Sequence, residues 1–410
     1  MNARTLRSSS RSASLQPTAV NAILSEVRQY QAQGRELVSL MRGEPDFRTP
    51  PHIVEAAVRA LRDGRTGYPD NRGEPALRKA VAEKLAGQNQ LSYDPDSEIL
   101  MVSGATYGIY AALTAILDDG DEVLLPDPIY DAYQSPIRLA GGRIRPVPAQ
   151  VRGQRFSLDR EALESAWTPA CKVLLLNTPW NPVGSVLTET ELADIAGFLE
   201  RHDLLLISDE IYEAITYEGR RHVSPAALSE SVRARCILVN SFSKTYAMTG
   251  WRVGYCAAPK ELVQAMFLVL QQSSRGPATF AQDAAVAALG GPQDCVAEMR
   301  AEYGRRRALV LEQLEGVPGM RVLPPEGGFF AMADIGELGL ASDEVRRRLL
   351  AESGVVVVHG SAYGPGGEGT LRISFAAGGE NLARGLGRLR EGLARLGARK
   401  NSGMVSPAPA

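Results

Sequence analysis

The chain has 410 residues, of which 44% are hydrophobic and 22% are charged, and its formal net charge is −2. This length provides for two or three domains with sizeable cores, and the near-neutral charge gives no electrostatic reason to expect a nucleic-acid or membrane partner. The four cysteines are scattered and the four histidines lie at no metal-ligand spacing, which argues against disulfides and a metal site and fits a cytoplasmic protein. The sequence also contains no apolar run of the roughly 18 residues that a membrane helix needs.

The two ends of the chain have a composition that favours no packed structure. Residues 1–13 are rich in arginine and serine and contain no acidic residue, which resembles a transit peptide. We interpret this segment as a disordered tail, and we expect the same of residues 399–410, which contain serine, glycine and proline. A helical apolar pattern begins after the first tail, at residues 20–31.

Short apolar runs alternate with helical patterns from about residue 99 to residue 257. The runs that we predict as strands are 99–102, 122–125, 144–147, 173–176, 204–207, 237–239 and 253–256. Most are continuous, which is typical of strands that are covered on both faces of a sheet. The pattern therefore predicts an α/β fold whose large domain has a mostly parallel seven-stranded sheet flanked by helices.

Beyond residue 300 the pattern changes, because strands 329–332, 355–358 and 371–375 precede a single long helix. That helix carries leucines four and three residues apart, at positions 382, 386, 389, 393 and 396, which form one apolar stripe. We therefore predict a small α+β domain formed by both chain ends, residues 14–48 and 291–398, and a large domain of residues 49–290.

Polar and aromatic residues follow five of the predicted strands. Ligands bind beyond the carboxyl ends of the strands in an open parallel sheet, so these residues should meet at one edge. They are Gly104-Ala105-Thr106, Tyr130, Asn181, Asp209 with Tyr212, and Lys244. Each alone has an ordinary structural explanation, such as a tight turn, a packed aromatic ring or a helix cap. Their occurrence together at one edge favours a ligand site.

Lys244 has unusual neighbours for a lysine. It is one of six in the chain, and the other five lie in segments typical of solvated surface. Lys244 instead follows the apolar run Ile237–Val239 and is flanked by hydroxyl and aromatic side chains. Partial desolvation lowers the pKa of a lysine and frees its amine to react with a carbonyl group.

This combination of groups suits pyridoxal 5'-phosphate. The cofactor needs an amine for its aldehyde, an anion site for its phosphate, a carboxylate at its ring nitrogen and an aromatic face. A helix start at Ala105 would bind the phosphate, and Asp209 would keep the pyridine nitrogen protonated, so that the ring accepts electrons. The sequence therefore predicts a pyridoxal-phosphate site.

From about Gln16 to Leu396 the chain resembles the class I and II aminotransferases, which are fold type I pyridoxal-phosphate enzymes. The blocks that carry the resemblance are residues 43–47, 68–69, 72–73, 177–184, 208–212, 241–254 and 371–374. The resemblance implies that Lys244 forms an aldimine with the cofactor and shuttles the substrate proton. It also implies catalytic roles for Asp209, at the ring nitrogen, and for Tyr212, at the phenolic oxygen.

The resemblance further implies two sets of binding residues. The cofactor-binding set is Gly104, Ala105, Thr106, Tyr130, Asn181, Asp209, Tyr212, Ser241, Ser243, Lys244, Arg252 and, reaching in from a neighbouring subunit, Tyr68. The substrate-binding set is Gly43, Asn181, Arg42 and Arg372, of which Arg372 would hold the α-carboxylate with two hydrogen bonds. A residue shared between subunits implies a homodimer.

We therefore expect an aminotransferase that moves an amino group from an L-amino acid to a 2-oxo acid by a ping-pong mechanism. A lyase, decarboxylase or cyclase of the same fold is an alternative, since the residues around the cofactor do not fix which Cα bond breaks. A non-catalytic ligand-sensing domain is a further alternative, disfavoured because few residues precede Gln16 and no basic face is apparent.

The amino donor and the acceptor stay open at this point. Arg42 is explained equally well as a solvated loop residue or as a residue that binds an acidic substrate side chain. Arg275 lies near the position of an arginine that certain aspartate-specific relatives use, but it does not clearly align with it.

Overall fold

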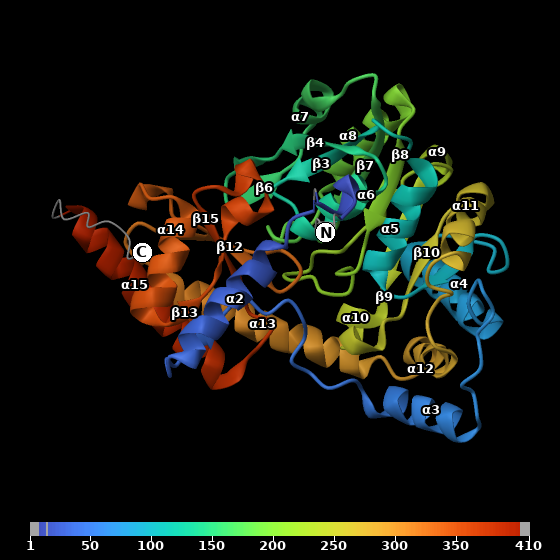
Figure 1. The fold of residues 1–410 in the computed structure, drawn as a ribbon, viewed down its shortest axis with the longest axis horizontal. Helices are drawn as coiled ribbons and strands as arrows, with labels where there is room; N and C mark the ends of the chain where they lie inside the picture. The colour runs from blue at the N-terminus through green and yellow to red at the C-terminus, as the bar shows by residue number, and fades with distance from the viewer. Residues whose placement is uncertain (1–7, 14, 402–410) are drawn as a thin grey trace, which may run out of the picture.

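The computed structural model describes residues 8–13 and 15–401. Its large sheet has the strand order β2-β10-β9-β8-β7-β3-β4 (Figure 1). The strands are β2 (Ile99–Val102), β3 (Glu122–Asp127), β4 (Arg143–Pro148), β7 (Cys171–Asn177), β8 (Leu205–Asp209), β9 (Cys236–Ser241) and β10 (Gly254–Ala257). Only β10 is antiparallel to its neighbours in this sheet. The predicted mostly parallel, seven-stranded sheet is confirmed.

Helices cover this sheet, because most of its strands are apolar on both faces. Every residue of β2 and β9 is buried, and α5 packs against β8, β9 and β10. The helices of this part of the chain are α3 (Pro51–Arg62), α4 (Pro75–Asn89), α5 (Ala105–Ile116), α6 (Gln134–Leu139), α7 (Arg160–Ala166), α8 (Glu189–His202), α9 (Glu230–Arg233), α10 (Phe242–Thr245), α11 (Lys260–Gln271) and α12 (Thr279–Gly290). A hairpin of β5 (Gln150–Arg152) and β6 (Arg155–Ser157) lies outside the main sheet.

A second, smaller sheet has the antiparallel order β11-β12-β15-β14. Its strands are β11 (Arg321–Leu323), β12 (Phe330–Asp334), β14 (Val358–His359) and β15 (Thr370–Ser374). The surrounding helices are α2 (Ala19–Ala32), α13 (Asp294–Leu314), α14 (Ser342–Arg348) and α15 (Gly379–Asn401). The predicted leucine stripe of α15 is buried in a second core cluster, which it shares with β12, β15 and α13.

Both ends of the chain meet in this smaller unit. Strand β1 (Val38–Ser39) pairs in parallel with β13 (Val355–Val356), and Figure 1 shows α2, in blue, beside the orange and red C-terminal elements. The predicted small α+β domain of both chain ends is therefore confirmed as a feature of the fold. Its exact boundaries stay a prediction.

Three details differ from the sequence-based expectation. Residues 355–358 form two strands in different sheets, since β13 pairs with β1 while β14 pairs with β15. Residues 10–13, expected within a disordered tail, form the short helix α1 (Ser10–Ala13). Helix α15 continues to Asn401, past the expected start of the second tail. The tail residues 1–7 and 402–410 lie outside the described part of the chain.

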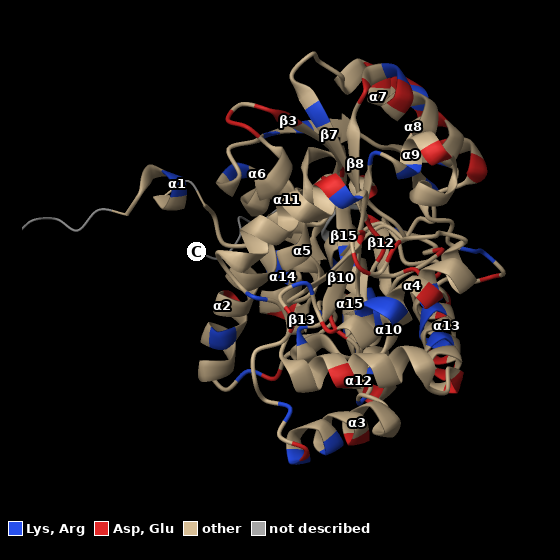
Figure 2. Ribbon diagram, turned by 90° about the vertical axis from the view of Figure 1, so that its right-hand side faces the viewer, with Lys and Arg blue, Asp and Glu red and all other residues tan. Residues whose placement is uncertain are grey.

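Charges of both signs are spread over the surface helices. Figure 2 shows basic and acidic residues interspersed along α3, α7 and α13. In the part of the chain that the structure describes, no helix combines the length and the apolar composition needed to cross a membrane.

Candidate active site

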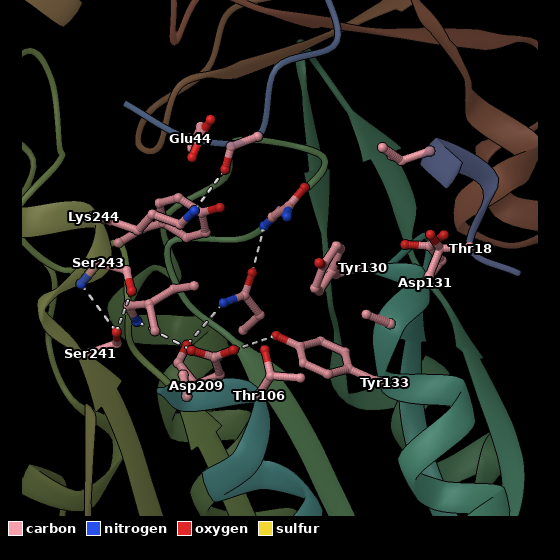
Figure 3. A pocket seen from close by; sticks show the side chains of 18 of the residues that line it. Thr18, Glu44, Thr106, Tyr130, Asp131, Tyr133, Asp209, Ser241, Ser243 and Lys244 are labelled. Carbon is pink, nitrogen blue, oxygen red and sulfur yellow. Dashed lines mark hydrogen bonds between the residues drawn. The ribbon is translucent and has the colours of Figure 1, made fainter. Parts of the chain in front are cut away.

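A cavity of about 450 Å³ opens at the carboxyl edge of the large sheet (Figure 3). Its volume falls within the usual range for small-molecule sites, roughly 300–1,000 Å³. The predicted site residues that line it are Gly43, Ala105, Thr106, Tyr130, Asn181, Asp209, Tyr212, Ser241, Ser243, Lys244, Arg252 and Arg372. The topology explains this convergence, because β3, β7, β8 and β9 run parallel and end at the same edge.

Lys244 lies on the short helix α10, directly after β9. Its Nζ donates a hydrogen bond of 2.7 Å to the carbonyl oxygen of Gly43. Burial lowers the pKa of Lys244 to about 8, an effect that Glu44 and Asp209 oppose and that Arg252 and Arg372 reinforce. A much larger fraction of this amine is therefore neutral at physiological pH than for an exposed lysine.

Asp209 ends β8 and is buried at the floor of the cavity. Tyr133 Oη donates a hydrogen bond of 2.6 Å to Asp209 Oδ2, as the dashed line in Figure 3 shows. Burial raises the pKa of Asp209 to about 6, and the hydrogen bonds from Tyr133 and from the Ile211 amide act against this rise. The carboxylate is therefore largely ionised at neutral pH and is available to a protonated nitrogen.

Tyr133 is a site residue that the sequence did not single out. It lies three residues after Tyr130, at the end of the 3-10 turn η1 (Asp131–Tyr133). The rings of Tyr130 and Tyr133 contact edge to face, with centroids 5.5 Å apart. Its spacing of three residues after Tyr130, itself a predicted site residue, was the one signal that could have identified it.

The start of α5 and Arg252 form an anion-binding end of the cavity. Gly104 has φ +86°, and a Cβ atom there would lie 2.4 Å from Arg252 Nη2. Arg252 donates hydrogen bonds to the carbonyl oxygens of Thr249, at 3.0 Å, and Ser103, at 3.4 Å. A helix N-terminus with an adjacent guanidinium favours a bound phosphate, and the close approach at Gly104 leaves no room for a side chain.

Arg372 lies in the middle of β15 and is 2% exposed. Its Nη1 donates to Asn181 Oδ1 and its Nη2 to the carbonyl oxygen of Met41, both at 3.3 Å. Its guanidinium lies 4.1 Å from the centre of the Phe330 ring, and its buried Nε has no partner among the described residues. A buried guanidinium with a donor left over is suited to an anionic ligand such as a carboxylate.

Two predicted site residues lie away from this cavity. The side chain of Arg42 is 43% exposed and pairs with Glu44 at 3.4 Å, which favours the solvated-loop interpretation. Tyr68 is 87% exposed, and the guanidinium of Arg275 lies 5.2 Å from the centre of its ring. Tyr68 and Arg275 thus form a contact at the surface, outside the residues that line the cavity.

One expectation about the lysines was wrong. Lys84, expected on the solvated surface, has a side chain that is 9% exposed and forms an ion pair with Glu213. Glu213 also accepts hydrogen bonds from Asn89 and Asn240. The sequence around Lys84 is helical and polar, and it does not indicate that this face of α4 packs against the segment that carries Glu213.

The fold and the site together place a lysine of lowered pKa in one cavity with a helix start and two arginines. The family model described as aminotransferase class I and II matches residues 35–389, and the chain belongs to this family. It is 39% identical over 370 residues to the aspartate aminotransferase of Bacillus sp. (strain YM-2), covering 88% of this chain and 93% of that one.

Two further relatives agree with this assignment. The aromatic-amino-acid aminotransferase 2 of Thermococcus litoralis is 42% identical over 363 residues, covering 88% of this chain and 92% of that one. The crystal structure of the aspartate aminotransferase from Rhizobium meliloti superposes with a TM-score of 0.91 at 34% identity, covering 95% of this chain and all of that one. The chain is therefore an aminotransferase, an enzyme that transfers nitrogenous groups, and the alternatives are not favoured.

Proposed function

We propose that this aminotransferase uses pyridoxal 5'-phosphate to move an amino group from an L-amino acid to a 2-oxo acid in ping-pong fashion. The observation that carries the proposal is a half-buried amine, Lys244, whose pKa is lowered by desolvation to about 8, in one cavity with Asp209, Arg252 and Arg372. Members of the family use this cofactor, which supplies an electron sink for the charge that develops at the substrate Cα.

Lys244 and Asp209 carry the proton chemistry in this proposal. The amine of Lys244, neutral in part at physiological pH, would hold the cofactor, and the same amine, once released, would be the group that accepts and returns the substrate proton. Asp209, largely ionised at neutral pH, would hold the ring nitrogen in its protonated form. Tyr133 positions that carboxylate through its 2.6 Å hydrogen bond.

The remaining residues bind and orient the cofactor. Arg252, the start of α5 at Gly104, Ala105 and Thr106, and the hydroxyls of Ser241 and Ser243 form the phosphate site. Tyr130 would cover one face of the cofactor ring, and Tyr212 and Asn181 would hold its phenolic oxygen as hydrogen-bond donors. All but Gly104 line the same cavity, and Gly104 caps the helix that borders it.

Arg372 orients the substrate. Its unpartnered Nε and one Nη hold the α-carboxylate, and the Gly43 backbone closes that end of the site. Binding the carboxylate at Arg372 would orient the substrate within the cavity that Lys244 also lines.

We also propose a cytoplasmic homodimer whose two sites share residues. Tyr68, 87% exposed, would reach the phosphate site of the neighbouring subunit. The four cysteines are free, and three of them are buried, which suits a reducing compartment.

A single-turnover experiment tests the proposed reaction. The purified enzyme with pyridoxal phosphate, mixed with an amino acid alone, should release one 2-oxo acid per site and lose the absorbance of the Lys244-bound cofactor; a 2-oxo acid should restore it. Lys244→Ala should abolish both changes, while Lys79→Ala, at a side chain 74% exposed, should leave them intact. Continuous release of ammonia or carbon dioxide, with no 2-oxo acid needed, would contradict amino transfer.

A further inference from the structure

The end of the cavity away from Lys244 has a distinct lining. Thr18, Asn21, Asp131, Ala132 and Pro136 line it. Figure 3 shows Thr18 and Asp131 beside each other there, with Tyr130 between them and Lys244. The residues assigned to the proposed cofactor and α-carboxylate sites lie outside this end, so we place a substrate side chain here.

Asp131 carries a carboxylate oxygen that lacks a partner. The residue is 9% exposed, and its Oδ2 accepts a hydrogen bond of 2.9 Å from the Ala19 amide at the start of α2. Its Oδ1 is buried and has no hydrogen-bond partner among the described residues. A buried polar atom left unpaired costs free energy, which a ligand that donates a hydrogen bond would recover.

The charges around the cavity point in the same direction. The lysine and arginine side chains that line it are Lys244, Arg252 and Arg372, each of which already has a role in the proposed function. Arg42, the sequence-based candidate for an acidic side chain, lies among solvated neighbours instead. Asp131 would repel a second substrate carboxylate at this end, whereas Glu44, the other further acid in the lining, lies beside Lys244 and pairs with Arg42 (Figure 3).

We propose, on the basis of the proposed amino-transfer function, that Asp131 selects substrates by their side chain. It favours amino acids whose side chain donates a hydrogen bond, such as an amide, and it disfavours aspartate, glutamate and their 2-oxo acids. Donation to Oδ1 by the substrate completes the carboxylate's hydrogen bonds, whereas a second carboxylate in the same place meets a like charge. On this proposal the chain would differ in substrate preference from its relatives named aspartate aminotransferases.

Three amino acids of similar length separate these effects. Glutamine offers an N–H donor, methionine offers none, and glutamate carries a negative charge. The wild-type enzyme, assayed with one common 2-oxo acid, should show the highest kcat/KM for glutamine and the lowest for glutamate. A hydrogen bond to a charged group contributes about 1.5–3 kcal/mol, so the glutamine-to-glutamate ratio should exceed roughly tenfold.

Asp131→Asn tests the role of the carboxylate without cutting its link to α2. The amide oxygen still accepts from the Ala19 amide, while the amide N–H group now faces the cavity. The ratio of kcat/KM for glutamine over glutamate should fall by about tenfold or more. Asp159→Asn is the matched control, because Asp159 also accepts a helix-start amide, Ala162 N–H at 2.9 Å, but lies outside the cavity.

A binding measurement separates failure of this proposal from failure of the proposed function. In the Lys244→Ala variant with pyridoxal phosphate, calorimetry should give a lower Kd for glutamine than for glutamate, and Asp131→Asn should remove the difference. If Asp131→Asn changes all three amino acids equally, or if wild type accepts glutamate as well as glutamine, the proposal is overturned. If the wild-type enzyme showed no single-turnover amino transfer while the binding preference stayed intact, only the proposed reaction would be rejected.

Discussion

At the scale of single residues, the pKa of Asp209 depends on its hydrogen bond with Tyr133. Asp209 would be held at a pKa well above its usual range by burial alone, and the hydroxyl of Tyr133 acts against that. The donor lies 2.6 Å from Oδ2, a distance typical of hydrogen bonds to an ionised group. Tyr133 therefore keeps Asp209 ionised down to a lower pH than its buried position would otherwise allow.

Tyr133→Phe should move the pH profile of the enzyme. Without the donor, the ionised form of Asp209 loses stabilisation and its pKa rises, so the acid limb of kcat/KM should shift to higher pH. The affinity for pyridoxal phosphate should fall roughly tenfold at neutral pH, given about 1.5–3 kcal/mol for a hydrogen bond to a charged group. A pH–rate series and a cofactor titration measure both effects.

Tyr93→Phe is the matched control for that variant. Tyr93 is also a buried tyrosine, but its hydroxyl has no hydrogen-bond partner among the described residues. The Tyr93→Phe variant should therefore leave the acid limb of kcat/KM at its wild-type pH. If Tyr133→Phe lowers thermal stability while the acid limb stays where it was, Tyr133 only packs the core.

The residues that the sequence could locate are those that follow a strand directly. Lys244 and Asp209 end up in the cavity because parallel strands carry them to one edge, and the strands were visible as apolar runs. Tyr133 and Asp131 could not be assigned, since the direction of a side chain on a 3-10 turn depends on how that turn packs. Arg42, for which the sequence left two interpretations open, is exposed, although its neighbour Gly43 lines the cavity.

At the scale of elements, the junction between β2 and α5 shapes the anion-binding end. Gly104 is the N-cap of α5, with φ +86° and ψ 160°, a backbone conformation that residues other than glycine rarely adopt. The guanidinium of Arg252 occupies the place where a Cβ atom would stand. The tight turn and the position of Arg252 are therefore coupled.

Gly104→Ala should weaken cofactor binding more than it weakens the fold. The added methyl group displaces Arg252, so the Kd for pyridoxal phosphate should rise by at least about tenfold, equivalent to about 1.4 kcal/mol. Backbone strain of roughly 1–3 kcal/mol should also lower Tm. A cofactor titration and a thermal melt of the cofactor-free protein distinguish the two effects.

Gly120→Ala separates strain from displacement. Gly120 has φ +97°, but a Cβ atom there would meet nothing within 4 Å. It should lower Tm by a comparable amount and leave the cofactor Kd unchanged. Equal losses of cofactor affinity in both variants would show that strain, rather than contact with Arg252, is responsible.

Element boundaries show where the sequence-based view of the fold ran out. The run Ile99–Val102 is matched residue for residue by β2, because an apolar strand buried on both faces has clear ends. Val355–Val358 is equally apolar, yet it divides between two sheets. Four valines in a row contain no information about which partner each one pairs with, and β1 is too short to have been recognised.

On the scale of the whole molecule, the cavity joins residues from both sheets. Arg372 comes from β15 of the smaller sheet, and Lys244 follows β9 of the larger one. We propose that the domain boundaries lie between residues 48 and 49 and between residues 290 and 291. Both positions fall between elements, just before α3 and between α12 and α13.

Tyr68 is the residue that the single chain leaves unexplained. Its ring is 87% exposed, under the guanidinium of Arg275, and Leu268 is exposed as well. An aromatic ring presented in this way is typical of a residue that contacts a partner. In the proposed homodimer, each site combines Lys244 of one subunit with Tyr68 of the other.

Mixed dimers test this arrangement. Lys244→Ala should be inactive, and Tyr68→Ala should retain amino transfer with a cofactor Kd raised roughly tenfold, the loss expected for one hydrogen bond to a charged phosphate. In a dimer of one Lys244→Ala and one Tyr68→Ala subunit, one site lacks both groups. The other site has both intact, so it should bind the cofactor with wild-type affinity and turn over normally. Dimers separated by two different affinity tags, and assayed at low cofactor concentration, provide the measurement.

Lys79→Ala paired with Tyr68→Ala is the control and should show one normal and one weakened site. If the mixed dimer binds cofactor only as weakly as Tyr68→Ala, each subunit uses its own Tyr68, and a protein that stays monomeric at assay concentration would equally exclude shared sites.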